Sequence, residues 1–485
     1  MLRRQFALLT QRRLVSEMST RKVQFATNGV SRVVTLTRPE KLNALSTDMC
    51  AAILPTLQEY SKSQLNNVIV LKSSSSPRAF CAGGDVAKVA MQTQAHGHTG
   101  EKVNRPQEFF VQEYSLNFLL ATYDRPIVAL MDGITMGGGV GLATHVPFRV
   151  ATENTKWSMP EMDIGFFPDV GTTFSLPQIT TLGGTEGQLA LYLCLTGDLL
   201  TGADVYVAGL ASNYVSSSNL TDLQARLAEL PVEDSERMYE ITASALEEFS
   251  TGLPEGYQFA YSPAKLDVIE KCFDINLGLD AILKKLAQTA ESASATPETK
   301  EFAVETLRKL GTKSPVSLQV AVEQFLRNRH SDVESALKQD LVTATNMCAD
   351  PKVEFAAATK HKLIDKQKTQ FPWTQTSLSV EELSRIVSPR PANPLSLLRF
   401  PGAVTWKRYP HHSKFMLPTE QQFRDYITGS DGSGRSLAVS RPEVVKYFSQ
   451  FNASSKGKTG IEYLCNLVCD RKCTVGKAGE LHWTD

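Results

Sequence analysis

The sequence lacks the features that would place it in several common protein classes. No run of about 18 uninterrupted apolar residues occurs, and an ordinary membrane-spanning helix requires such a run. No GxxxxGKS/T loop is present, which excludes a P-loop nucleotide site. One glycine run follows a strand-like segment, but Leu142 stands where a dinucleotide-binding fingerprint needs its third glycine. We therefore expect neither a membrane span nor a bound nucleotide cofactor.

Cysteine is sparse, with 8 among 485 residues, and no secretory signal precedes it. Free thiols in a reducing compartment are the expected state. Cys465, Cys469 and Cys473 share one face of a predicted helix, and their spacing favours a buried apolar stripe over a zinc site, whose ligands usually lie closer together on turns. We interpret His411 and His412 as a solvated pair. No metal ion is expected.

Acidic residues are missing from residues 1–16, which carry four arginines among Leu, Phe and Ala. A basic, amphipathic and acid-poor start is typical of a mitochondrial transit peptide, which we assign to residues 1–20, and it indicates a location in the mitochondrial matrix. The alternative is a disordered basic arm. The formal net charge is zero, yet residues 390–485 carry 14 Lys and Arg against 8 Asp and Glu. An acidic body is therefore expected between two basic ends.

The first half of the chain alternates short segments rich in Val and Ile with helical segments. This alternation predicts an α/β layered core over residues 21–216. From residue 217 to 387 the strand signals fade and apolar residues recur with helical spacing, which predicts a mainly helical second part. The predicted strands of the core are residues 32–38, 66–72 and 126–132, and its first predicted helix is residues 46–60.

Three prolines within residues 388–394 predict a linker. The remaining residues, 395–485, are expected to form a small basic C-terminal extension, separate from the core. Helical patterns in this extension cover residues 418–427, 441–451 and 461–469.

Three successive glycines, Gly137 to Gly139, follow a predicted strand and begin an apolar helical segment. Glycine at such a point lets a ligand approach bare backbone N–H groups, which stabilise an oxyanion. A second small-residue turn, at residues 77–85, offers the N–H group of Ala82. Two backbone donors from different turns predict a two-pronged oxyanion hole. The alternative is that the glycines only allow close packing of strand and helix.

Two carboxylates, Glu161 and Asp169, stand eight residues apart, each directly after a proline and among apolar residues. A carboxyl group in an apolar pocket has a raised pKa and can act as a general base or acid. The alternative is a pair of loop carboxylates that cap helices.

Four segments occur in an order that resembles the crotonase, or enoyl-CoA hydratase/isomerase, superfamily. They are TRPEKLNALS (37–46), AFCAGGD (79–85), DGITMGGGVGL (132–142) and MPEMDIGFFPDVG (159–171). The resemblance extends over roughly residues 25–375. It implies a crotonase-type fold, a spiral of ββα repeats.

Within this superfamily, the detail resembles the 3-hydroxyisobutyryl-CoA hydrolase branch. The hydratases use two glutamates, and the place of the first is Gly141 in this chain. The hydrolases lack that glutamate, keep the second at the place of Glu161, and add an aspartate at the place of Asp169. The resemblance therefore implies hydrolysis of a short β-hydroxyacyl-CoA thioester, best matched by 3-hydroxyisobutyryl-CoA in valine catabolism, without a metal or other cofactor.

The resemblance also implies roles for single positions. Glu161 and Asp169 match the catalytic acids, and Ala82 and Gly138 match the oxyanion-hole donors. The positions that match substrate-binding residues are Leu42, Ala44, Gly83, Gly84, Asp85, Glu113 and Gly137.

Two alternative functions remain open. One is an enoyl-CoA hydratase or isomerase. The other is a structural or moonlighting component of the small subunit of the mitochondrial ribosome, since some of these subunits contain a protein that resembles this hydrolase. Besides the acyl-CoA substrate, the candidate partners are the mitochondrial ribosome and a second copy of the chain; no membrane or DNA partner is expected. The C-terminal extension either binds a ribosomal partner through a basic patch or folds back on the acidic body. The patch would comprise Arg399, Lys407, Arg408 and Lys414 around Trp406 and Tyr409.

Overall fold

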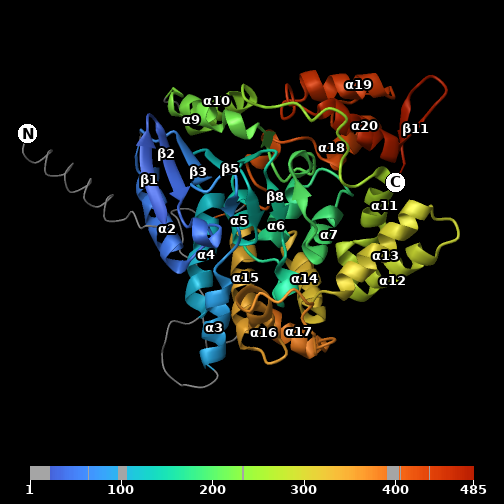
Figure 1. Ribbon diagram of the computed structural model, residues 1–485. Helices are drawn as coiled ribbons and strands as arrows, with labels where there is room; N and C mark the ends of the chain where they lie inside the picture. The colour runs from blue at the N-terminus through green and yellow to red at the C-terminus, as the bar shows by residue number, and fades with distance from the viewer. Residues whose placement is uncertain are drawn as a thin grey trace, which may run out of the picture.

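The computed structural model describes residues 22–484 except 64, 97–105, 232–233, 390–403, 405 and 436. The predicted transit peptide and most of the predicted linker lie outside these described residues. In Figure 1 the strands of the N-terminal half extend from β1 and β2 at the left edge of the molecule to β5 and β8 near its middle. Helices of the middle of the chain lie along one side of these strands, and the C-terminal helices lie along another.

A six-stranded sheet forms the first layer, in the order β1-β2-β3-β5-β7-β10. Only the β1–β2 pair is antiparallel; the other neighbours run parallel. All five residues of β5 are buried, as expected for a parallel strand covered on both faces. The strands are β1 (Val23–Asn28), β2 (Ser31–Leu36), β3 (Val68–Ser73), β5 (Ile127–Met131), β7 (Phe148–Ala151) and β10 (Asn213–Tyr214).

A smaller four-stranded sheet, in the order β4-β6-β8-β9, forms the second layer. Strands of the two sheets alternate along the chain, because β3, β5 and β7 of the first sheet are followed by β4, β6 and β8 of the second. Each pair then leads into a helix, α3, α5 or α6. This ββα repeat confirms the crotonase-type α/β fold expected from the sequence. The new elements are β4 (Ala79–Cys81), β6 (Ile134–Met136), β8 (Lys156–Ser158), β9 (Leu200–Thr201), α3 (Val86–His96), α5 (Gly138–Thr144) and α6 (Thr172–Ile179).

Helices cover both faces of the six-stranded sheet. On one face, α9 and α10 pack against strand residues such as Val68, Val128 and Phe148. The opposite face belongs to the main hydrophobic core, to which α2 and α4 contribute. The helices of this first half are α2 (Thr47–Ser61), α4 (Pro106–Ala121), α7 (Gln188–Thr196), α8 (Ala203–Val207), α9 (Leu220–Ala228) and α10 (Ser235–Glu247), with short 3₁₀ turns at Pro39–Lys41, Glu161–Ile164 and Ser217–Asn219.

The described residues from 263 to 387 form helices without a strand, as the spacing of their apolar residues predicts. The long helices α14 and α15 pack beside α6 and α4, so this part of the chain encloses the region after β8. The helices are α11 (Pro263–Cys272), α12 (Gly278–Glu291), α13 (Pro297–Gly311), α14 (Pro315–Asn328), α15 (Val333–Ala349), α16 (Phe355–Thr359) and α17 (Val380–Val387), with a 3₁₀ turn at Ile275–Leu277 and a π-helical turn at Lys360–Ile364.

The C-terminal segment, residues 406–484, packs against the body, and its buried apolar side chains join the main core. The expectation of a separate extension is therefore wrong, and the structure favours the alternative in which the segment folds back. Its elements are α18 (Glu420–Thr428), α19 (Arg441–Lys446), α20 (Ile461–Lys472), β11 (Cys473–Val475) and β12 (Leu481–Trp483), with a 3₁₀ turn at His412–Lys414 and a π-helical turn at Tyr447–Phe451.

Buried charges join the C-terminal segment to the acidic body. The Arg471 side chain is fully buried and contacts carboxylates of Asp267, Glu270 and Glu420. The Lys458 ammonium group donates to Glu247 at 2.5 Å. Some of the basic side chains of this segment therefore form ion pairs within the molecule.

Two smaller expectations about this segment are also wrong. His412 is buried, not solvated, because its ring stacks on Tyr409 and its Nε2 donates to the Thr144 carbonyl at 3.0 Å. Tyr409 is buried as well, so it forms no part of a basic surface patch. Lys407 and Arg408 are exposed, and Arg399 lies outside the described residues.

Among the described helices, none is long and apolar enough to cross a membrane.

Candidate active site

The glycine turn between β6 and α5 lies against two carboxyl groups. Gly137 has φ +47°, a conformation that favours glycine, and Gly138 is the first residue of α5. A methyl group on Gly137 would lie 2.7 Å from Oε1 of Glu161, and one on Gly138 would lie 2.3 Å from Oε1 of Glu113. Only glycine therefore keeps the space between this turn and the carboxyl groups open.

The second turn corrects one predicted role. The Ala82 N–H group donates to the Leu42 carbonyl at 3.0 Å, so it is not available to a substrate oxygen. Gly84 lies closer to the glycine turn, since a methyl group on Gly138 would lie 3.1 Å from the Gly84 nitrogen. Within the described part of the chain, the Gly84 N–H group donates to no acceptor, and Gly138, as a first helical residue, has no acceptor in its own helix. The free pair of backbone donors is thus Gly84 and Gly138.

The other residues that were predicted to bind substrate near this turn help to hold its backbone conformation. Leu42 adopts a left-handed conformation with φ +50°, and the N–H group of Leu45 donates to the Gly83 carbonyl at 2.8 Å. Asp85 forms an ion pair with Arg38 at 2.7 Å, and the same arginine donates to the Ala44 carbonyl at 3.0 Å. These contacts connect residues 38–45 to the turn. They also pair the Asp85 carboxylate with Arg38.

Three acids meet at this site. Glu113 comes from α4, Glu161 from the turn after β8, and Asp169 from the loop before α6. Their exposed fractions are 2%, 7% and 6%. Oε1 of Glu113 and Oε2 of Glu161 have no hydrogen-bond partner among the described residues. A polar ligand that donates to these buried carboxyl oxygens would supply the partners that they lack among the described residues.

Burial raises the pKa of all three carboxyl groups. The pKa of Glu113 lies well above its ordinary value because of burial and then the charges of Asp169 and Glu161. Burial and the charge of Asp169 likewise raise the pKa of Glu161. Burial raises the pKa of Asp169 to about 7, while the hydrogen bond from Tyr114 opposes the rise. Near neutral pH the site can therefore hold both protonated and ionised carboxyl groups, which general acid and base chemistry requires.

Several side chains of this site were not predicted from the sequence. The Tyr114 hydroxyl donates to Oδ2 of Asp169 at 2.6 Å. Asp340 of α15 accepts the Gly171 N–H group at 2.7 Å. Asn117, one turn after Glu113 on α4, is buried, and its amide has no partner among the described residues. The position of Asn117, four residues after Glu113 on a helix, is a weak sequence signal for its place in the site. Asp340 lies 169 residues after its partner Gly171, and the sequence gives no signal for this contact.

Gly141 shows that the site has no space for a further acid at that position. A methyl group there would lie 2.7 Å from Cβ of Val170 and 3.0 Å from the Asn117 amide nitrogen. A glutamate at position 141, where the hydratases carry their first catalytic glutamate, would therefore collide with the loop that carries Asp169.

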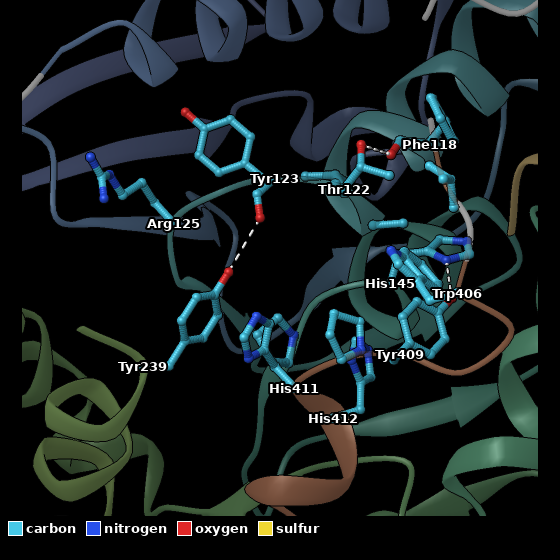
Figure 2. A pocket seen from close by; sticks show the side chains of 15 residues that line it. Phe118, Thr122, Tyr123, Arg125, His145, Tyr239, Trp406, Tyr409, His411 and His412 are labelled. Atoms are coloured by element: carbon cyan, nitrogen blue, oxygen red, sulfur yellow. Dashed lines mark hydrogen bonds between the residues drawn. The ribbon is translucent and has the colours of Figure 1, made fainter. Parts of the chain in front are cut away.

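A cavity of about 290 Å³ lies elsewhere, between the end of α4, the end of α5 and the C-terminal segment. Figure 2 shows Tyr239 beside His411 on one side of it and Trp406 and Tyr409 near His145 on the other. The three acids do not line this cavity. No group of three or more potential metal ligands occurs among the described residues.

The ββα fold with a glycine turn beside buried acids is the arrangement that the resemblance to the crotonase superfamily, a class of enzymes that act on CoA esters, leads us to expect. The comparison with known families supports this class. The chain belongs to the enoyl-CoA hydratase/isomerase family, whose model matches residues 31–386. The C-terminal segment lies beyond that match.

Two kinds of protein are found among the curated relatives, and a solved structure is similar as well. The small ribosomal subunit protein mS47 of Neurospora crassa is 36% identical over 456 residues, which cover 93% of this chain and 85% of that protein. The mitochondrial 3-hydroxyisobutyryl-CoA hydrolase of Rattus norvegicus is 33% identical over 368 residues, which cover 76% and 88%. A crystal structure of a carnitinyl-CoA dehydratase from Mycobacterium thermoresistibile is 26% identical with a TM-score of 0.61, over 77% of this chain and 98% of that one.

Proposed function

We propose that this protein hydrolyses a short β-hydroxyacyl-CoA thioester, with 3-hydroxyisobutyryl-CoA as the best candidate. The observation that carries the proposal is the pair Glu161 and Asp169 beside two free backbone donors, with no space for a hydratase glutamate at Gly141. Relatives named as 3-hydroxyisobutyryl-CoA hydrolases support the choice of substrate.

The proposed chemistry starts at the thioester carbonyl. The N–H groups of Gly84 and Gly138 bind its oxygen and stabilise the negative charge that develops there. Glu161, when ionised, either activates a water molecule or attacks the carbonyl carbon to give an anhydride that water then opens. The CoA thiolate leaves without a strong acid because the pKa of a thiol is about 8.5.

Asp169 has a separate role in this proposal. Its carboxylate, fixed by the Tyr114 hydroxyl, orients the 3-hydroxyl of the substrate or the attacking water. A substrate without that hydroxyl would lose this contact but keep the thioester contacts. We therefore expect 3-hydroxyisobutyryl-CoA to be hydrolysed faster than isobutyryl-CoA.

The test compares three thioesters with the purified protein, with free thiol as the readout. Hydrolysis of 3-hydroxyisobutyryl-CoA above isobutyryl-CoA supports the proposal. Addition of water to crotonyl-CoA without thiol release would assign the chain to the hydratases instead.

The match to the mS47 protein of Neurospora crassa extends over more of this chain than the family match does, and this extent suggests a second function. A match over 93% of the chain must include residues of the C-terminal segment, which the family model does not reach. We propose that the protein also associates with the small subunit of the mitochondrial ribosome. The relatives named as mitochondrial 3-hydroxyisobutyryl-CoA hydrolases support a mitochondrial location.

Co-sedimentation in mitochondrial lysate tests this second function. Migration of the chain with the small ribosomal subunit supports it, and migration as a free small oligomer contradicts it. Catalysis and incorporation do not exclude each other, so thiol release is measured on the same fractions.

A further inference from the structure

The loop that carries Asp169 is held in an unusual conformation. Val170 has φ +52°, which a β-branched residue rarely adopts. Such a conformation persists only where neighbouring groups hold it. The next residue, Gly171, donates its N–H group to Asp340 at 2.7 Å, which fixes one side of the loop.

His145, at the end of α5, fixes the other side of the loop. Its Nε2 lies 2.7 Å from the Val170 carbonyl oxygen, and its Nδ1 lies 2.5 Å from the Tyr409 hydroxyl. A carbonyl only accepts, so Nε2 carries the proton, and the neutral ring then accepts at Nδ1 from the tyrosine. Burial lowers the pKa of His145 to about 4, which keeps the ring neutral.

Tyr409 belongs to the C-terminal segment and is itself well fixed. Its ring stacks on His412 at 3.9 Å and lies 5.5 Å from Phe174 of α6. Its backbone N–H group donates to the Gln178 side chain at 3.2 Å. In Figure 2 the rings of His145 and Tyr409 lie together at the edge of the cavity, where the C-terminal segment meets the body.

We propose that Tyr409 and His145 are positioning residues, through which the C-terminal segment holds the Val170 turn and so places the Asp169 carboxylate. The hydrogen bonds run from the Tyr409 hydroxyl to His145 and from His145 to the Val170 carbonyl, next to Asp169. The segment beyond the family match thus contributes to the active site without touching it. This inference rests on the proposed catalytic role of Asp169.

The test removes one hydroxyl group and uses a matched control. Tyr409→Phe keeps the ring but loses the hydrogen bond to His145. The control is Tyr206→Phe, because the Tyr206 hydroxyl is also buried and also joins body to C-terminal segment, through the Thr459 carbonyl at 2.9 Å. We expect Tyr409→Phe to lower kcat about tenfold with KM within about twofold, and Tyr206→Phe to leave both near the values of the unchanged protein.

Two further measurements separate positioning from general stability. In an Asp169→Asn background, Tyr409→Phe should lower kcat no further, since its effect acts through Asp169. Amide hydrogen exchange of the peptide over residues 167–173 should be faster in Tyr409→Phe than in Tyr206→Phe.

Equal losses of kcat in the two tyrosine variants, or an additive loss in the Asp169→Asn background, would overturn the inference. Unchanged exchange over residues 167–173 would overturn it as well. If the unchanged protein releases no thiol, the proposed function fails, and the exchange measurement alone then decides whether Tyr409 holds the turn.

Discussion

A single methyl group at Gly138 should stop catalysis while leaving the fold intact. In Gly138→Ala the new Cβ would lie 2.3 Å from Oε1 of Glu113, more than 1 Å inside ordinary contact, and 3.1 Å from the Gly84 nitrogen. It would occupy the space between the two proposed oxyanion donors. Loss of one such donor costs about 3–4 kcal/mol of transition-state stabilisation, so kcat should fall about 10²- to 10³-fold.

Stability should change little in this variant. Gly138 is helical, so alanine restores up to about 1 kcal/mol of helix propensity, against an overpacking cost of about 1–3 kcal/mol. The matched control is Gly311→Ala, since Gly311 ends α13 and a methyl group there meets nothing within 4 Å. Thiol release and thermal melts are measured for both variants. Normal turnover by a folded Gly138→Ala protein would refute the oxyanion role of this turn.

Three further predictions concern charge. The pKa of Glu113 is raised in the folded protein, so above about pH 4.5 the folded protein keeps a proton on this carboxyl group that the unfolded chain has lost. The free energy of unfolding therefore falls as the pH rises above about 4.5. Glu113→Gln removes this loss, so chemical denaturation should show a gain in the free energy of unfolding at pH 8 that disappears below about pH 4.5; a constant gain at all pH values would contradict the linkage. Tyr114→Phe removes a donor that favours ionised Asp169, whose pKa is about 7, so the acid limb of the kcat/KM profile should move to higher pH, and an unmoved limb would assign it to another group. Arg471→Met removes the arginine that pairs with the buried Glu420 carboxylate and leaves that carboxylate with the Gly184 N–H group at 3.0 Å and the Lys472 ammonium group at 3.9 Å. We expect a loss of about 3 kcal/mol of stability in denaturant titrations; a loss below about 1 kcal/mol would show that this pair is dispensable.

The core elements could be predicted because their signals are local. Val- and Ile-rich segments became β2, β3 and β5, and the glycine run became the turn before α5. The two acids could be named because each follows a proline in an apolar segment, and the structure brings both to the glycine turn with Glu113. Their roles remain predictions until activity is measured.

The errors arose where long-range contacts decide the outcome. Ala82 and Gly84 look equivalent in the sequence, and only the pairing of Ala82 with the Leu42 carbonyl shows which N–H group stays free. His412 was expected to be solvated, yet it is buried against the body, and so is the Arg471 side chain of the same basic segment. Counting charged residues gives the net charge of a segment, but it does not show which partner each charged group contacts.

The most direct test of the central claim is thiol release from 3-hydroxyisobutyryl-CoA by the unchanged protein and by Glu161→Gln. The amide keeps the size of the side chain but can act neither as base nor as nucleophile. We predict steady release of CoA by the unchanged protein, and a loss of about 10²-fold or more in kcat for Glu161→Gln with CoA-ester binding retained. No release by the unchanged protein, or near-normal turnover by Glu161→Gln, would contradict the account.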